Sequence, residues 1–171
     1  MLYEQCKEAT WYAHLCNREN FHPYPISSER ENWENLPEEL KSAQVQRGEE
    51  HLNASYPLLP ATLYLEFVRN GNRDRYQAAY FKRRIMLSEL TLAECVENQG
   101  RFLDQILDGI WAVCEETNWC IPAHKGVEDP LCPELKVDLF AAETGALLAW
   151  ISYLLGERLD EISPAVDSRI V

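Results

Sequence analysis

Residues 80–124 read YFKRRIMLSELTLAECVENQGRFLDQILDGIWAVCEETNWCIPAH, and this stretch predicts two helices joined by a tight turn at Gly100. The second helix, over residues 101–117, has the clearest pattern, because apolar side chains recur every three or four residues with polar ones opposite. Its apolar rows are Phe102, Ile106, Ile110 and Val113, and Leu103, Leu107, Trp111 and Cys114. Gly100 is the expected stop of the first helix, over residues 73–98, although a capping box at residues 91–94 leaves open a break near Ser88.

Shorter patterns outside this hairpin predict further helices. They cover residues 2–18, 37–53, 61–69 and 135–155, with a short helix from Pro164 to the end of the chain. Residues 21–36 are the expected irregular linker, since Pro23 and Pro25 each remove a backbone donor. Strand signals are weak throughout. We therefore expect one all-α domain over residues 1–171, built of antiparallel helical hairpins.

The predicted helix over residues 135–155 is apolar nearly all round, so we expect it to be buried and to end at Gly156. Ala141, Gly145 and Ala149 form a strip of small side chains that lets another helix approach closely. The final helix has only about two turns, and a helix that short is marginal by itself in water. We expect the chain to be a fragment of a longer protein, with a short helix docked on the core as the alternative.

The chain of 171 residues carries a net charge of −12, and 46% of its residues are hydrophobic. This composition favours a folded domain and argues against nucleic acid or a membrane surface as a partner. The start of the chain has no basic or apolar leader pattern, which favours a cytoplasmic location. Six cysteines lack zinc-ribbon spacing, so reduced thiols are expected, and neither a metal nor another cofactor is predicted.

The loop after the hairpin contains Trp119, Pro122 and His124. A tryptophan offers a flat apolar face to a sugar ring, and a histidine exchanges protons near neutral pH. These residue types therefore suggest a sugar-binding cleft. The alternative is a tryptophan packed on the hairpin and a solvated or capping histidine.

Charged residues supply a second set of candidates. A basic stretch holds either carboxylates and sulfates or simply a solvated helix face; it contains Arg69, Arg73, Arg75, Lys82, Arg83 and Arg84. Asp138 suits the N-cap of the following helix. Glu143 lies in an apolar helix and needs a partner, a cleft or a raised pKa. Glu116 and Glu143 are a candidate carboxylate pair for a glycosidase.

Several motifs together resemble the helical N-terminal part of heparinase II/III-like proteins, over about residues 30–171. They are YFKRR at 80–84, LAE at 92–94, GRFLD at 100–104, IW at 110–111, EE at 115–116, WxxPxH at 119–124 and DLFAAET at 138–144. The resemblance implies an incomplete (α/α) toroid, a curved array of helical hairpins with a substrate groove. It also implies a polysaccharide lyase that cleaves uronic-acid-containing glycans by β-elimination.

The resemblance places the family's asparagine-rich motif and catalytic tyrosine after the helix that begins at Pro164, where this chain ends. It thus implies that residues 1–171 are not catalytic alone and work with a missing C-terminal toroid region and a β-sandwich. We expect an acidic oligo- or polysaccharide to contact four residues, Trp119, His124, Glu116 and Glu143. The alternatives are a glycoside hydrolase with an (α/α) barrel and a helical protein-interaction scaffold around Trp111 and Trp119.

Overall fold

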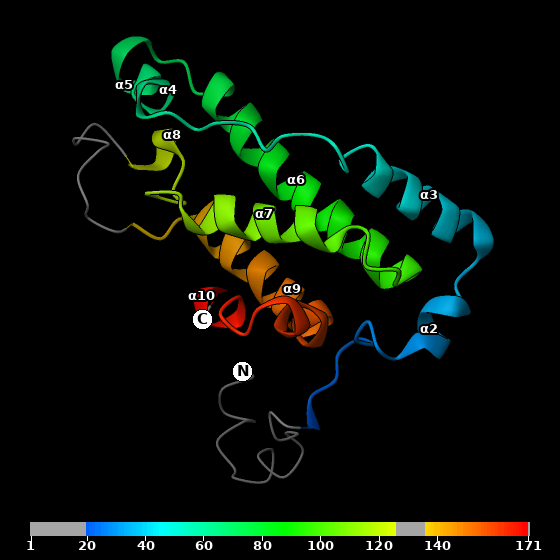
Figure 1. The fold of residues 1–171 in the computed structure, drawn as a ribbon. Helices are drawn as coiled ribbons and strands as arrows, with labels where there is room; N and C mark the ends of the chain where they lie inside the picture. Colours follow the sequence, from blue (N-terminus) through cyan, green and yellow to red (C-terminus); the bar gives the residue numbers. More distant parts are fainter. Residues whose placement is uncertain (1–19, 126–135, 171) are drawn as a thin grey trace, which may run out of the picture.

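The computed structural model describes residues 20–125 and 136–170, and within these ranges every regular element is a helix (Figure 1). The helices are α2 (Arg30–Glu34), α3 (Glu38–Glu49), α4 (Ala61–Tyr64), α5 (Glu66–Asn70), α6 (Asp74–Glu97), α7 (Leu103–Cys114), α8 (Pro122–Lys125), α9 (Leu139–Ile162) and α10 (Asp167–Ile170). The predicted all-α class is confirmed, whereas the toroid stays a prediction. The helix predicted over residues 2–18 lies outside the described residues.

Helix α6 is the centre of the fold, because α3 packs along one side of it and α7 and α9 pack along the other (Figure 1). It is continuous through Ser88, so the capping-box sequence at residues 91–94 begins no new helix. The side chains of Leu87 and Leu90 on α6, Ile106 on α7 and Ile151 on α9 are fully buried in one apolar core. Burial of these side chains is the main driving force for stacking the three helices.

The turn between α6 and α7 is held by a buried carboxylate. Asn98 and Gly100 both have positive φ angles, 56° and 82°, which end α6 and reverse the chain. Glu94, which is fully buried, accepts hydrogen bonds from the backbone N–H groups of Gly100 and Phe102 at 2.7 and 3.4 Å. Arg158 of α9 lies 3.4 Å from the same carboxylate. This side chain therefore joins the hairpin to the third helix.

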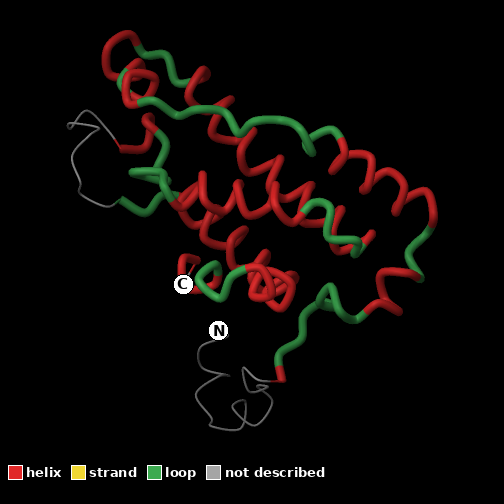
Figure 2. The backbone as a smooth tube through the Cα atoms, in the orientation of Figure 1, coloured by secondary structure: helices red, strands yellow, loops and turns green. Residues whose placement is uncertain are grey.

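Residues 21–36 contain the short helix α2, so this segment is not wholly irregular as predicted. Arg30 of α2 donates to the carbonyl oxygens of Cys95 and Val96 at 2.7 and 2.9 Å. A cation is favourable at this C-terminal end of α6, where carbonyl groups lack helical partners. Figure 2 shows the other long irregular stretch, which leads from α3 back along the stacked helices to α4.

Helix α9 differs from the prediction in length and in burial. It begins at Leu139, passes Gly156 without a break and ends at Ile162. Only one face is buried, and it carries Thr144, Leu148, Ile151, Leu155 and Leu159. The prediction of a helix buried all round was wrong, because composition does not reveal how many neighbours a helix has. Gly145 of the small-residue strip has open space beside it instead of a close helix.

By length and composition, α9 is the single helix in residues 20–125 and 136–170 that could span a membrane. Core helices of soluble proteins meet the same criterion, so this is weak evidence in either direction. Because 22% of its most apolar window is buried, most of that window faces away from the described core. The absence of a membrane partner stays a prediction.

Two glycines provide a matched test of this packing. Gly48 of α3 lies against α6, and a Cβ atom there would overlap Ala93 and touch the Phe102 ring. We expect Gly48→Ala to lower the free energy of unfolding by about 1 kcal/mol or more, despite alanine's higher helix propensity. Gly145→Ala, in open space, should raise it by up to about 1 kcal/mol. Urea denaturation of both variants measures this contrast, and equal responses would contradict the packing.

Candidate functional site

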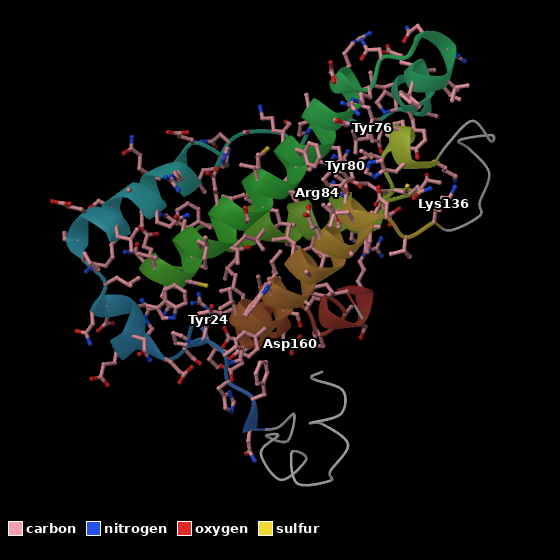
Figure 3. All side chains as sticks on the ribbon, turned by 180° about the vertical axis from the view of Figure 1, so that it is seen from behind. Tyr24, Tyr76, Tyr80, Arg84, Lys136 and Asp160 are labelled. Atoms are coloured by element: carbon pink, nitrogen blue, oxygen red, sulfur yellow. The ribbon has the colours of Figure 1, made fainter. Side chains whose placement is uncertain are left out.

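A polar junction lies at the N-terminal half of α6, and Tyr80 is its centre. The Tyr80 hydroxyl lies 2.9 Å from the Trp119 carbonyl oxygen, 3.2 Å from the Phe140 carbonyl oxygen and 2.9 Å from Thr144 Oγ1. Figure 3 shows Tyr76, Tyr80 and Arg84 following one another along α6. The guanidinium carbon of Arg84 is 3.3 Å from the centre of the Tyr80 ring. The junction joins α6, α9 and the loop after α7.

Two neighbouring arginines share one carboxylate in this junction. Arg84 forms a bidentate pair with Glu116, with nitrogen–oxygen distances of 2.6 and 3.0 Å. Arg83 donates to the same carboxylate at 3.1 Å and to the carbonyl oxygens of Pro57 and Ala112 at 2.6 and 2.8 Å. The Glu116 side chain is 3% exposed. A buried carboxylate needs such partners, because an unpaired buried charge is strongly unfavourable.

A pocket of about 300 Å³ opens beside this ion pair, at the C-terminal end of α7. Its lining residues are Leu59, Ala61, Tyr64, Tyr76, Arg83, Trp111, Ala112, Glu115, Glu116, Thr117 and Asn118. Aromatic rings, a guanidinium group and polar side chains thus converge in one concave site. Ligand pockets commonly have such mixed walls and volumes of about 300 to 1,000 Å³. We call it the α7 pocket.

The tyrosines of the α7 pocket are held in their neutral form. Burial raises the pKa of Tyr64 and of Tyr76 well above the ordinary value of 10.0, with smaller contributions from nearby negative groups. The Tyr64 hydroxyl donates to the Cys120 carbonyl oxygen at 2.9 Å. Neutral phenols can offer hydrogen bonds and an apolar ring, but they do not supply a charge near neutral pH.

His124 forms a second polar feature, outside the α7 pocket. Its Nδ1 atom lies 2.7 Å from Asp138 Oδ2, and its ring stacks on Phe140 with centroids 5.4 Å apart. Asp138 is also the N-cap of α9, as predicted, and accepts the Ala141 N–H at 2.7 Å. With Nδ1–H donating to the carboxylate, Nε2 carries the lone pair. The imidazole is 42% exposed, so this edge can accept a hydrogen bond from a ligand.

The other predicted contact residues are placed differently. Trp119 packs against the apolar core, and its indole N–H donates to the Val113 carbonyl oxygen at 2.9 Å. Cys120, Ile121 and Pro122 after it are buried. Glu143 is exposed on α9, so the predicted need for a partner, a cleft or a raised pKa does not arise. Of the four residues, Glu116 alone lines the α7 pocket.

The prediction of contact residues missed Tyr64, Tyr76 and Arg83 as pocket residues. Arg83 belongs to the basic stretch singled out above, where Arg73, Arg75 and Lys82 are indeed exposed. Arg83 and Arg84 are buried instead, with side chains 9% and 11% exposed. Their position beside Tyr80 on one face of a long amphipathic helix was the available signal. The partner carboxylate, 32 residues away, carried no local sign.

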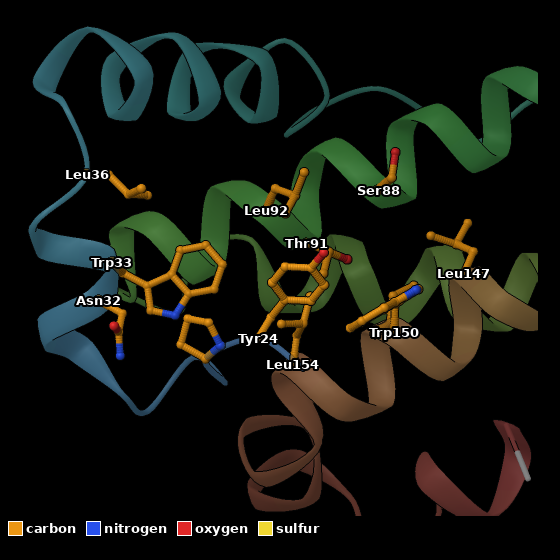
Figure 4. A pocket seen from close by; sticks show the side chains of 12 residues that line it. Tyr24, Asn32, Trp33, Leu36, Ser88, Thr91, Leu92, Leu147, Trp150 and Leu154 are labelled. Atoms are coloured by element: carbon orange, nitrogen blue, oxygen red, sulfur yellow. The ribbon is translucent and has the colours of Figure 1, made fainter. Parts of the chain in front are cut away.

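A larger, nearly apolar groove of about 500 Å³ lies between α2, α6 and α9 (Figure 4). Tyr24, Trp33 and Trp150 lie around it with Leu92 and Leu154. Burial in such a groove suits apolar groups, since it offers few polar atoms for ordering a sugar. It is therefore a weaker candidate for carbohydrate than the α7 pocket.

Paired substitutions separate packing tryptophans from surface ones. Trp119→Ala should lower the free energy of unfolding by about 2 kcal/mol or more, because it removes core packing and a hydrogen bond. Trp111, whose side chain is 57% exposed, is the matched control, and Trp111→Ala should cost less than about 1 kcal/mol. Thermal and urea unfolding measure both. A stable Trp119→Ala variant with impaired glycan binding would instead restore the sugar-contact role.

Asp138 makes stability depend on acid pH. Burial raises the pKa of its carboxyl group, but hydrogen bonds from Ala141, His124 and Ile121 outweigh burial, so the pKa lies below the ordinary value of 3.8. The charged form thus stabilises the fold above the unfolded pKa of about 3.9, and this contribution is lost as pH falls through the lower folded pKa.

We expect the stability difference between wild type and Asp138→Asn to shrink as pH falls from about 6 to about 2. Asp160→Asn, an exposed change on the same helix, is the control and should show no such trend. Urea unfolding at a series of pH values provides the measurement. A difference that stays constant over this range would rule out the charged carboxylate as the cause.

Comparison with known proteins assigns no family to the chain. Neither the protein-family models nor the curated proteins searched give a match. The functional argument therefore rests on the α7 pocket and on the exposed edge of His124.

Proposed function

We propose that residues 1–171 are the N-terminal helical part of a heparinase II/III-like polysaccharide lyase and hold an acidic glycan. The observation that carries this proposal is the α7 pocket, where Tyr64, Tyr76 and Arg83 meet at the end of a helical hairpin. Aromatic rings and polar groups in one concave site suit a sugar ring with its hydroxyl groups. The sequence resemblance independently predicts a substrate groove in a helical array.

β-Elimination on a uronate requires a group that neutralises the carboxylate, a base for the C5 proton and an acid for the leaving oxygen. Among the described residues, Arg83 is suited to the first requirement because it is cationic and buried beside the pocket. The base and the acid are proposed to lie in a C-terminal toroid region and a β-sandwich, as the resemblance implies. In this proposal the protein acts in the cytoplasm without a cofactor.

The glycoside hydrolase alternative depends on Glu116 paired with Glu143. Glu116 is engaged on both oxygens by Arg83 and Arg84, which leaves it poorly placed to donate a proton to a leaving group. The interaction-scaffold alternative is favoured by a different observation, the apolar groove with Trp33 and Trp150. Such an aromatic groove is typical of surfaces that bind apolar side chains of a protein partner.

An activity assay separates the three functions. The whole protein that carries these residues is incubated with heparosan, a uronate polymer, and with neutral dextran as the control glycan. A lyase should release products with the ultraviolet absorbance of an unsaturated uronate from heparosan only. Cleavage without this absorbance would indicate hydrolysis. Neither cleavage nor glycan binding, together with binding of a protein partner, would favour the scaffold.

The exposed edge of His124 gives a residue-level test of the same proposal. Loss of one ligand hydrogen bond costs about 1 kcal/mol, so His124→Ala should weaken glycan affinity about fivefold. His22→Ala, which removes another exposed histidine, is the control and should leave affinity unchanged. Equal affinities of the two variants would remove His124 from the glycan site.

A further inference from the structure

The charges around the α7 pocket do not balance. Arg83 and Arg84 share Glu116, and Arg169 pairs with Glu115 on the pocket rim. Three guanidinium groups therefore meet two carboxylates. This local excess of positive charge occurs in a chain whose net charge is −12. Buried charges are normally compensated, so the excess suggests that an anion completes the cluster.

Arg83 is the residue through which an anion would enter this cluster. Its Nε and Nη1 atoms donate to Pro57, Ala112 and Glu116. Its Nη2 atom, in contrast, has no hydrogen bond to any side chain or carbonyl group within residues 20–125 and 136–170, although Arg83 lines the pocket. A guanidinium group held by two backbone carbonyls and a carboxylate is fixed in orientation. It can therefore bind an oxyanion with little further loss of side-chain entropy.

A second donor on the pocket wall is fixed in the same way. Asn118 Oδ1 accepts the backbone N–H of Cys120 at 2.8 Å. Because a backbone N–H requires an acceptor, this bond assigns the oxygen and leaves the side-chain NH₂ group to donate elsewhere. Asn118 and Arg83 both line the pocket and together supply donors for one ligand.

We propose that the α7 pocket binds the carboxylate of a single hexuronate residue through Arg83, an inference that rests on the proposed function. One carboxylate matches the excess of one positive charge, whereas several sulfates would overcompensate it. A pocket of about 300 Å³ accommodates one sugar ring rather than a long oligosaccharide. Tyr64 and Tyr76 supply apolar ring surface, and Asn118 supplies a donor for a hydroxyl group.

Direct binding of small probes tests the charge requirement. The chain of residues 1–171 is titrated calorimetrically with D-glucuronate, D-glucose and inorganic sulfate. Glucuronate and glucose share the ring hydroxyl groups and differ in the carboxylate. A charge-assisted hydrogen bond contributes about 1.5 kcal/mol or more, so glucuronate should bind at least about tenfold more tightly than glucose. Sulfate should bind more weakly than glucuronate because it lacks the ring.

A substitution on the rim tests the excess charge without disturbing the buried ion pairs. Glu115, whose side chain is 55% exposed, lines the pocket, and Glu115→Gln should tighten glucuronate binding about threefold by adding net positive charge. Glu50→Gln, an exposed change at the end of α3, removes the same charge elsewhere and should leave affinity unchanged. Arg83→Lys keeps the charge but loses the planar fork, so glucuronate binding should weaken about tenfold.

Each remaining result overturns the carboxylate proposal in a different way. Equal binding of glucuronate and glucose would leave a carbohydrate pocket without charge recognition, so the proposed function would survive. Sulfate binding as tight as glucuronate binding would indicate a simple oxyanion site. Absence of binding by all probes, with uronate cleavage still present in the lyase assay, would place the substrate elsewhere. An unchanged affinity in Glu115→Gln would remove the charge argument itself.

Discussion

The carboxylate of Glu116, buried between Arg83 and Arg84, is the interaction on which the arrangement of this end of the molecule depends. It binds the residue after α7 to the middle of α6. Arg84 extends the connection to Thr144 of α9 through a 2.9 Å hydrogen bond. Such a cluster is strongly destabilised by the loss of one partner, because the remaining charge would be left buried. The helical layers and the pocket beside them thus share one electrostatic constraint.

The same cluster explains why a polar pocket exists in a helical core. Apolar packing holds α6, α7 and α9 together over most of their length. At the C-terminal end of α7, guanidinium groups replace apolar side chains and bind backbone carbonyl oxygens of Pro57 and Ala112. Polar groups that are fixed by the fold can recognise a ligand without reorganising, which is favourable for affinity. The pocket is therefore rigid on its charged side.

The two concave regions of the molecule differ in chemistry. The α7 pocket combines charge, aromatic rings and hydrogen-bond donors, whereas the groove around Trp33 and Trp150 is almost wholly apolar. A sugar needs hydrogen bonds to its hydroxyl groups, and a protein partner offers apolar side chains. Carbohydrate recognition and partner binding are therefore assigned to separate surfaces instead of competing for one.

The sequence by itself determined the helical class, the hairpin around Gly100 and the N-cap at Asp138, because these follow from local periodicity, backbone preference and short-range hydrogen bonding. It also directed attention to the stretch after α7. Tertiary structure alone decided that Arg83 and Glu116 meet and that Trp119 faces the core. It likewise decided that one face of α9 stays uncovered in the described residues. Pairing and burial between distant segments depend on neighbours that no local pattern contains.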